Sequence, residues 1–359
     1  MSIPERTNGS LRNYPSVGLV SDIVFRDHET TDDHPENSRR LNAIDDLLDD
    51  SGLRSQCVPI DIVPIDELAL RRVHDHSLLT FLADADRRAE LNSVFIDSDT
   101  VMNERSYSVS RLASGVVLRA SQLVAVGDLD SVFCILRPPG HHAGRFRSMG
   151  FCLINHVAVA AADLMANRLT ERVVVIDFDV HHGNGTQEIF YENPDLLYIS
   201  IHQDPLYPGT GHIEERGRGV GFGTTLNLPL PPGCGDAAYL ICMDEVVIPS
   251  VLRFSPTIIF ISAGFDAHWR DPLSHANVSC DGFNVMTEKI QTVAAEIGAG
   301  TVYSLEGGYD LEALAWSVRG SVDKLLENPT VADPIGCPRM SVVSDINPVI
   351  EQAKMLHEL

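Results

Sequence analysis

Six short apolar runs rich in β-branched residues recur along the 359-residue chain, and they limit the folds open to it more than any other feature. Helix-like segments lie between them at residues 155–169, 236–254 and 281–298. Continuously apolar strands that alternate with helices indicate a parallel sheet covered on both faces. The sequence therefore predicts an α/β protein with a central, mainly parallel sheet. Its expected strands lie in residues 17–25, 131–136, 172–180, 196–202, 257–265 and 301–307.

No sequence feature marks a boundary between domains, since the chain has no internal repeat, low-complexity tract or Gly/Ser-rich linker. We therefore expect one domain over residues 1–359, with 44% hydrophobic residues to build its core. The longest apolar runs are far shorter than the roughly 20 residues of a membrane-spanning helix, so no membrane partner is expected. The polar N-terminus lacks the apolar core of a signal peptide, which favours a cytoplasmic protein.

The chain is strongly acidic, with a formal net charge of -23. This charge repels a phosphate backbone, so nucleic acid is not expected as a direct partner, whereas cationic peptides or polyamines would be attracted. The seven cysteines are an odd number without a CxxC pair, which argues against a disulfide framework and against a thiolate zinc site. The oligomeric state stays open, with a homo-oligomer among the alternatives.

Polar motifs follow five of the six predicted strands. Because the carboxyl ends of parallel strands meet at one edge of a sheet, where ligands of such folds gather, we expect these five segments to converge. The motifs read "RPPGHHA", "DFDVHHG", "SIHQD", "SAGFDAH" and "LEGGYD".

The segment "DFDVHHGNGTQ" at 177–187 carries the clearest metal-binding pattern. Asp177, Asp179 and His181 are spaced i, i+2 and i+4, which places them on one face of an extended chain. Asp179 and His181 would hold a metal with Asp177 beside them, and Asp266 would supply the third ligand. Three such ligands leave a position open to water, as in catalytic zinc sites, although iron(II) or manganese would also suit them. A single one of these residues would as readily be a capping or solvated group.

The adjacent histidines His141 and His142 suit proton transfer to and from water at such an ion, because histidine titrates near neutrality. Each imidazole works better when an acceptor fixes its second nitrogen, and we assign Asp177 to His141 and Asn184 to His142. Tyr309, after two glycines, is placed to donate a hydrogen bond to a developing oxyanion. Ordinary loop histidines and a turn tyrosine are the alternatives on local pattern alone.

In this order, the motifs resemble those of the zinc-dependent histone deacetylase family, which includes bacterial deacetylase-like amidohydrolases and acetylpolyamine amidohydrolases. The resemblance also rests on "GFCLINHVAVAA" and "PLYPGTG", and it runs from "HPENSRRL" at 34–41 to about residue 325. "NLPLPPGCGDAAY" at 227–239 and Asn184 are more similar to the class II branch than to the class I branch.

The resemblance implies the arginase-like, doubly wound α/β fold with helices on both faces of the sheet. It implies metal-assisted hydrolysis of an acetyl amide to acetate and a free amine, with His142 as general base. It also implies a role for each matching position: zinc ligands Asp179, His181 and Asp266; catalytic residues His141, His142, Asp177, Asn184 and Tyr309; a substrate tunnel with Gly150, Phe151 and Tyr207; and a potassium site with Asp177, Ser200 and Ile201.

Leu273 bears on the substrate. Polyamine-preferring members of the class II branch carry glutamate at the matching position, so leucine favours acetyl-lysine in a peptide or protein, or a simpler acylated amine. The alternative is an acetylpolyamine amidohydrolase, which the negative charge favours. Asp97 and Asp99 would either hold a peptide backbone at the rim or be solvated loop acids, and the second reading is preferred. The loop "HWRDPLSHA" departs from the Gly-rich form common in the family.

Three other functions fit the residues less well. A dinuclear manganese ureohydrolase would need further carboxylates, as in a "DAHxD" segment, and "DVHHG" has no such pair. A non-hydrolytic acyl-lysine binding module would be expected if Tyr309 or a metal ligand were missing. "GRGVGFG" at 217–223 lacks the spacing of a nucleotide-binding loop and precedes a strand-like segment, so we expect a flexible loop there.

Overall fold

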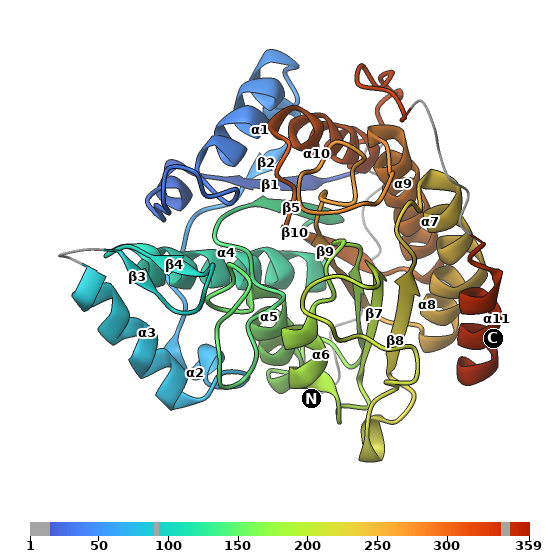
Figure 1. Ribbon diagram of the computed structural model, residues 1–359, viewed down its shortest axis with the longest axis horizontal. Helices are drawn as coiled ribbons and strands as arrows, with labels where there is room; N and C mark the ends of the chain where they lie inside the picture. Colours follow the sequence, from blue (N-terminus) through green and yellow to red (C-terminus); the bar gives the residue numbers. More distant parts are fainter. Residues whose placement is uncertain (1–14, 90–92, 339–344) are drawn as a thin grey trace.

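An eight-stranded parallel sheet forms the centre of the computed structural model, which describes residues 15–89, 93–338 and 345–359 (Figure 1). Every neighbouring pair of its strands is parallel, so the predicted α/β class is confirmed. In spatial order the strands are β2 (Val58–Pro59), β1 (Val17–Ser21), β5 (Ser131–Ile135), β10 (Gly300–Leu305), β9 (Ile258–Ala263), β6 (Val173–Asp177), β7 (Leu196–Gln203) and β8 (Thr225–Leu230).

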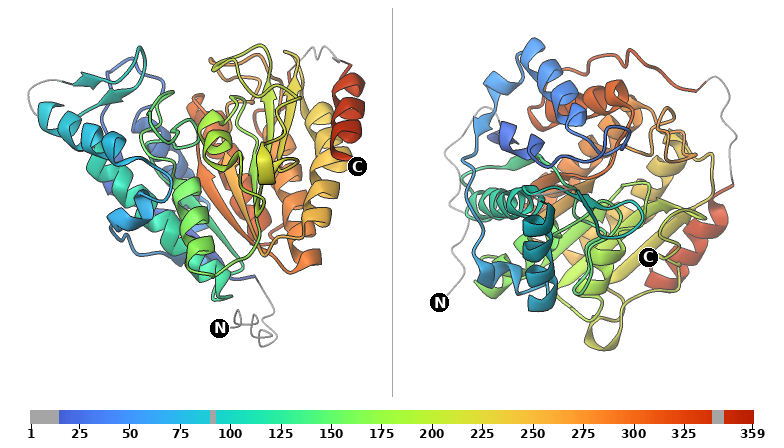
Figure 2. Two further views of the ribbon diagram at one scale, coloured as in Figure 1. Left: turned by 90° about the horizontal axis from the view of Figure 1, so that it is seen from below. Right: turned by 60° about the vertical axis from the view of Figure 1, so that its left-hand side comes forward.

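Helices cover both faces of this sheet (Figures 1 and 2). One layer contains α4 (Ser106–Ala125) and α5 (His156–Ala166), which pack against each other and against the central strands. The opposite layer contains α1 (Arg39–Asp50), α10 (Leu311–Leu325), α9 (Cys280–Ile297), α7 (Asp236–Cys242) and α8 (Ile248–Phe254). The last helix, α11 (Asn347–His357), packs along the edge strand β8.

The remaining elements lie in the connections, and all of them except α3 are short. They are α2 (Glu67–Leu70), α3 (His76–Ala89), α6 (Asn184–Phe190), η1 (Ile23–Arg26), η2 (Arg54–Gln56), η3 (Gly219–Gly221) and a hairpin of β3 (Val94–Phe95) with β4 (Val101–Met102). The glycine-rich segment 217–223, expected to be a loop, holds the single turn η3 before β8.

The sequence explains where the main elements lie. All residues of β5, β6, β9 and β10 are buried, as expected for β-branched strands covered on both faces. Side-chain caps begin α5 and α10, with Asn155 accepting from Ala158 N–H at 2.9 Å and Asp310 accepting from Ala313 N–H at 2.9 Å. The predicted helix at 236–254 is interrupted by a π-helical turn, η4 (Met243–Val247), between α7 and α8.

Five neighbouring strands carry the polar motifs. β5, β10, β9, β6 and β7 are adjacent in the sheet, so the loops that follow them start from one edge. The hydrophobic core lies below that edge, between the sheet and its two helix layers. Within the described residues, no helix is both long enough and apolar enough to cross a membrane.

Candidate active site

The loops after β6 and β9 bring together the three predicted metal ligands. One potential ligand atom from each of Asp179, His181 and Asp266 lies within 4.8 Å of the other two, and all three residues are buried. His181 Nδ1 is 3.1 Å from Asp179 Oδ1 and 3.0 Å from Asp266 Oδ2. The strand β6 ends at Asp177, so Asp179 and His181 lie in the bend that follows it. Their positions therefore do not come from the alternation of side chains along a strand, as the i, i+2, i+4 spacing had predicted.

Backbone groups hold the two carboxylates in place. Asp179 accepts hydrogen bonds from Gly307 N–H at 2.8 Å and from His181 N–H at 2.9 Å, while Asp266 accepts from Val180 N–H at 2.9 Å. A Cβ atom on Gly307 would lie 2.1 Å from Asp266 Oδ2, so only glycine fits this approach. The carboxylates are therefore fixed by backbone donors from two chain segments, one after β6 and one after β10.

The electrostatics of this cluster suit a cation. Although burial lowers the pKa of His181, the charges of Asp266 and Asp179 outweigh it and raise that pKa to about 10. Burial raises the pKa of Asp266, and the nearby charge of Asp179 raises it further. Two buried carboxylates beside one imidazole form an unfavourable charge cluster that a divalent cation would neutralise. The nitrogen and oxygen donors match those of catalytic zinc sites.

Two adjacent imidazoles lie next to the predicted ligands. The rings of His141 and His142 are 4.0 Å apart between centroids. His141 Nδ1 lies 3.1 Å from Asp177 Oδ2, and His142 Nδ1 lies 2.8 Å from Asn184 Oδ1. The structure thus brings together the pairs that the sequence analysis named, and one acceptor is a carboxylate whereas the other is a neutral amide.

This difference in acceptors separates the two histidines electrostatically. The charges of Asp179 and Asp177 overcome the effect of burial and raise the pKa of His141 to about 10. Burial lowers the pKa of His142 well below its usual value, and the positive charge of His141 lowers it further. Groups whose environments push their pKa values apart are suited to different roles in proton transfer.

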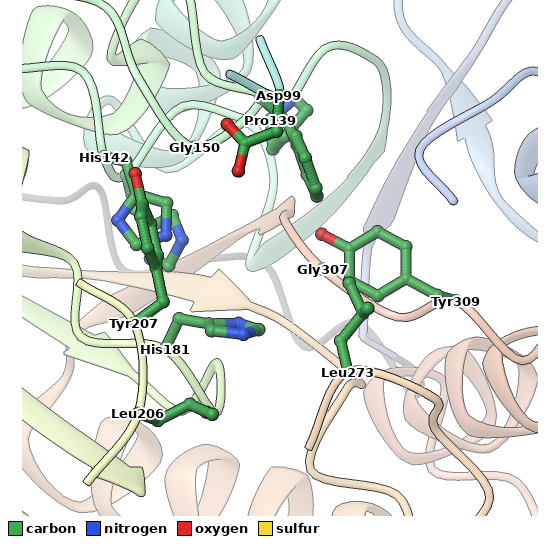
Figure 3. Close-up of a pocket in the computed structure, with 12 residues that line it drawn as sticks. Asp99, Pro139, His142, Gly150, His181, Leu206, Tyr207, Leu273, Gly307 and Tyr309 are labelled. Atoms are coloured by element: carbon green, nitrogen blue, oxygen red, sulfur yellow. The ribbon is translucent and has the colours of Figure 1, made fainter. Parts of the chain in front are cut away.

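A cavity of about 230 Å³ leads to these groups (Figure 3). The three predicted tunnel residues and the substrate-selecting Leu273 all line it, and so does Leu206, which sequence reasoning did not single out. Asp99 is partly buried and also lines the cavity, whereas Asp97 accepts hydrogen bonds from its own loop at Asp99 and Thr100. The lining residues are Asp99, Pro139, His141, His142, Gly150, Phe151, His181, Leu206, Tyr207, Leu273, Gly307 and Tyr309.

Aromatic rings line the cavity and pack against the proposed catalytic residues. Tyr207 meets His142 edge to face at 5.2 Å, and Phe151 meets Tyr309 edge to face at 5.9 Å. Phe151 has a left-handed backbone with φ 68°, and Thr100 Oγ1 accepts its N–H at 3.1 Å. The preceding Gly150 has no room for a side chain, because a Cβ atom would lie 2.5 Å from His142 Cδ2.

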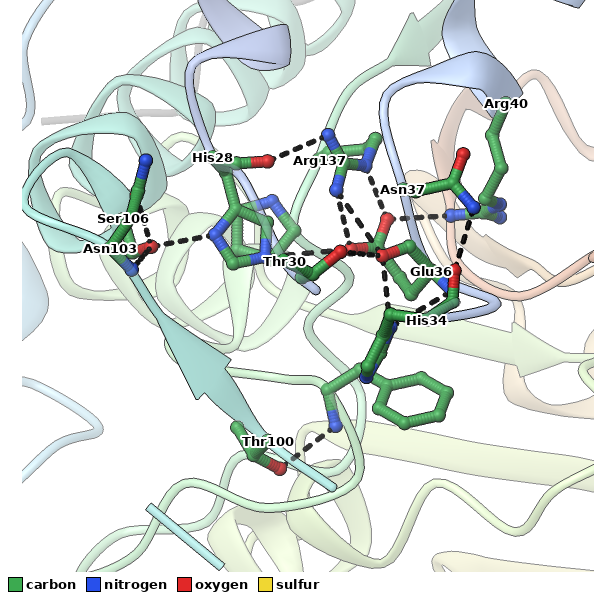
Figure 4. A network of polar contacts seen from close by, with 12 residues as sticks. His28, Thr30, His34, Glu36, Asn37, Arg40, Thr100, Asn103, Ser106 and Arg137 are labelled. Atoms are coloured by element: carbon green, nitrogen blue, oxygen red, sulfur yellow. Dashed lines mark hydrogen bonds and ion pairs between the residues drawn. The ribbon is translucent and has the colours of Figure 1, made fainter. Parts of the chain in front are cut away.

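Glu36, Arg40 and Arg137 form a buried ion-pair network that contacts the segment before Tyr309, and the sequence analysis missed it (Figure 4). Glu36 accepts from Arg137 through both carboxylate oxygens and from Arg40 Nη1 at 3.1 Å. Arg40 also donates to Gly308 O at 2.7 Å and to Glu306 O at 2.5 Å. The guanidinium lies 5.0 Å over the ring of Tyr309. The only available signals were charged residues within "HPENSRRL" and before "PPGHH".

The predicted potassium site has a less distinctive geometry. Ser200 Oγ lies 2.9 Å from His202 Nδ1, and Asp177 Oδ2 accepts from Tyr198 at 3.1 Å as well as from His141. Ser200 and Ile201 are buried in β7 beside β6. Potassium binding by this segment stays a prediction.

The fold and site have clear relatives among known proteins. The histone deacetylase domain matches residues 34–325. The chain is 40% identical over 346 residues to "Histone deacetylase 10, chloroplastic" of Oryza sativa subsp. japonica, covering 91% of this chain and 78% of that protein. It is 37% identical over 301 residues to a "Probable deacetylase" of Archaeoglobus fulgidus, covering 82% of each.

A solved structure shares the whole architecture. The crystal structure of the HDA15 HD domain superposes with a TM-score of 0.86 at 33% sequence identity, covering 96% of this chain and 94% of that chain. The protein is thus a hydrolytic enzyme with the fold of the deacetylases. The chain belongs to the histone deacetylase family, as the order of its motifs predicted.

Proposed function

We propose that this deacetylase uses zinc to hydrolyse the acetyl amide of N-acetyl-lysine in peptides or proteins, releasing acetate and the free amine. The observation that carries the proposal is the convergence of Asp179, His181 and Asp266 beside a cavity. His181 lines this cavity together with His141, His142 and Tyr309. When bound, zinc would supply a Lewis acid that polarises the acetyl carbonyl and makes water more acidic. Potassium, a cytoplasmic location and a single domain stay predictions.

His142 is the general base in this proposal. Its Nδ1–H donates to Asn184 Oδ1, an orientation supported by the Asn184 amide nitrogen lying 3.5 Å from Met149 Sδ. The neutral ring then offers Nε2 to take a proton from the attacking water. The same nitrogen later gives that proton to the departing amine. The Asp177 carboxylate lies 3.1 Å from His141 Nδ1, which orients this ring and favours its protonated form beside the developing negative charge.

Tyr309 donates to the carbonyl oxygen as negative charge develops there. Burial raises the pKa of its phenol well above the usual value, so the hydroxyl keeps its proton near neutral pH. The Phe151 ring lies edge to face with the Tyr309 ring at 5.9 Å and the Arg40 guanidinium lies 5.0 Å over it, which limits the directions in which the hydroxyl can point. A fixed donor aimed at developing charge is typically a large contributor to catalysis of amide hydrolysis.

The walls of the cavity suit a lysine side chain. Leu206 and Leu273 add aliphatic surface to the two aromatic rings, Phe151 and Tyr207, which fits four methylene groups. Leu273 offers no charge to a second amine of the substrate. Acetylpolyamine hydrolysis is a second candidate, favoured by the net charge of -23 and by the Asp99 carboxylate in the cavity lining. In the preferred proposal, Asp99 instead accepts backbone N–H groups of a peptide.

A substrate panel tests the choice between these candidates. The purified enzyme is assayed with an acetyl-lysine peptide, acetylputrescine and longer acyl-lysines, and the proposal predicts the highest kcat/KM on the acetyl-lysine peptide. Leu273→Glu should shift the ratio toward acetylputrescine, because it adds a carboxylate for the distal amine. A wild-type preference for acetylputrescine would overturn the substrate assignment.

Tyr309→Phe tests the mechanism separately. Removing one oxyanion donor should lower kcat by about 10²- to 10³-fold. Zinc content should not change, because the phenol is not one of the proposed ligands. Full activity in this variant would refute the assigned role of Tyr309.

A further inference from the structure

We propose that Asp271 is a positioning residue that holds the backbone of Tyr309, and so sets where the phenol lies in the substrate cavity. This inference rests on the proposed deacetylase mechanism, in which Tyr309 donates to the substrate carbonyl. It assigns a function to a residue of the loop "HWRDPLSHA" that none of the sequence motifs explained.

The Asp271 carboxylate joins two loops of the site. One oxygen accepts from Tyr309 N–H at 2.7 Å, and the other accepts from Leu273 N–H at 2.9 Å. Asp271 is only 7% exposed, so water does not compete readily for these bonds. Its loop follows β9 and also carries the proposed ligand Asp266, whereas Tyr309 follows β10. The Asp271 side chain thus connects the segment that carries Tyr309 with the loop that carries the cavity-lining Leu273.

The backbone before Tyr309 needs such a constraint. Gly307 and Gly308 precede it, and Gly308 has φ 119°, a conformation that side chains rarely allow. Arg40 donates to the carbonyl oxygen of Gly308 at 2.7 Å. The N–H of the next residue, Tyr309, donates to Asp271. Packing by Phe151 holds the ring itself. With the Asp271 bond lost, a small rotation about the glycines would displace the hydroxyl at the far end of the side chain.

The expected effect follows from the sensitivity of catalysis to such displacements. A misplacement of about 1 Å can lower a rate by about 10²-fold. Asp271→Asn keeps the size of the side chain but turns an amide NH₂ toward one of two backbone N–H donors, so one of the two bonds is lost. We expect kcat to fall by about 10- to 100-fold, with KM changed by less than about threefold and zinc content unchanged.

A double-mutant cycle separates positioning from general damage. The wild type, Asp271→Asn, Tyr309→Phe and the double variant are assayed on the acetyl-lysine peptide. If Asp271 acts through the phenol, adding Asp271→Asn to Tyr309→Phe should lower kcat by less than about threefold. An equal loss in both backgrounds, or full activity of both Asp271→Asn and Asp271→Ala, would overturn the inference, because alanine removes both bonds. Should Asp271→Asn fold poorly, Asp271→Ser is carried through the same cycle with the same expectation.

The control and the parent proposal give distinguishable outcomes. Asp86 likewise accepts two backbone N–H groups, from Tyr107 at 2.9 Å and Ser108 at 3.3 Å, but it does not line the cavity. Asp86→Asn should therefore leave kcat within about twofold. If Tyr309→Phe alone keeps full activity, the proposed mechanism fails. If Tyr309→Phe is impaired and the two losses multiply, only the role of Asp271 fails.

Discussion

Replacing Glu36 with glutamine should destabilise the protein strongly. Glu36 is the shared partner of two guanidinium groups, Arg137 and Arg40, and the side chains of all three are completely buried. Glutamine has nearly the same shape but no charge, so both cations would remain buried without a counter-charge. The variant therefore isolates the electrostatic contribution of the network from its packing.

The size of the effect follows from this burial. Removing one partner from a buried ion pair typically costs about 3–5 kcal/mol, because an uncompensated charge stays in a poorly solvated site. The glutamine oxygen can still accept one hydrogen bond from Arg137, which places the expected loss near the lower end, about 3 kcal/mol. With an m-value near 3 kcal/mol/M, the urea midpoint would fall by roughly 1 M.

Equilibrium urea unfolding, followed by tryptophan fluorescence and circular dichroism, measures this loss. Glu192→Gln is the matched control, since Glu192 pairs with Arg218 at the surface, where both side chains are more than half exposed. Its midpoint should move little, because exposed ion pairs contribute little to stability. A Glu36→Gln midpoint equal to that of the control would refute the reasoning about the buried network.

Two further predictions concern buried groups near the catalytic loops. His74 must stay neutral, because its Nδ1 donates to Gly144 O at 2.9 Å while its Nε2 accepts from Asn155 N–H at 3.0 Å, and burial lowers its pKa to about 4. The pKa of His74 in the folded protein is therefore below its value of about 6.5 in the unfolded chain. The contribution of neutral His74 to the free energy of unfolding is complete above about pH 6.5 and is lost as the pH falls toward about 4. As the pH is lowered from 7 to 5, the thermal unfolding midpoint should decrease, and it should decrease less in His74→Gln than in the wild type. An equal decrease in both proteins would contradict the neutral state assigned to His74. Gly307→Ala should strip zinc and activity together, because its Cβ would lie 2.1 Å from Asp266 Oδ2, and a zinc-loaded, active variant would show that the loop has room to move.

The sequence predicted the sheet and the converging loops because their causes are local. β-branched runs form buried strands wherever helices can cover both faces, and the carboxyl ends of parallel strands must meet. The pairs His141 with Asp177 and His142 with Asn184 were accessible for the same reason, since each joins the segment that follows β5 to the end of β6 or to the segment that follows β6. Matching motifs to a known family then added roles that spacing alone left open.

Other parts of the site depend on contacts that no local pattern encodes. Glu36 is 101 residues from Arg137, and Arg40 is 268 residues from Gly308, so neither contact leaves a periodic signal. The sequence predicted a strand through His181, but the chain bends after Asp177 instead. In this bend His181 Nδ1 lies 3.0 Å from Asp266 Oδ2, a contact with a segment distant in sequence. These features follow from packing between distant segments.

Anomalous diffraction at the zinc absorption edge, from crystals of the wild-type protein grown with zinc, tests the proposed metal site most directly. We predict one strong peak at the end of the cavity, coordinated by the side chains of Asp179, His181 and Asp266. A crystal of active enzyme in which zinc lies elsewhere, or in which these three side chains point to separate places, would contradict the proposed zinc-dependent mechanism.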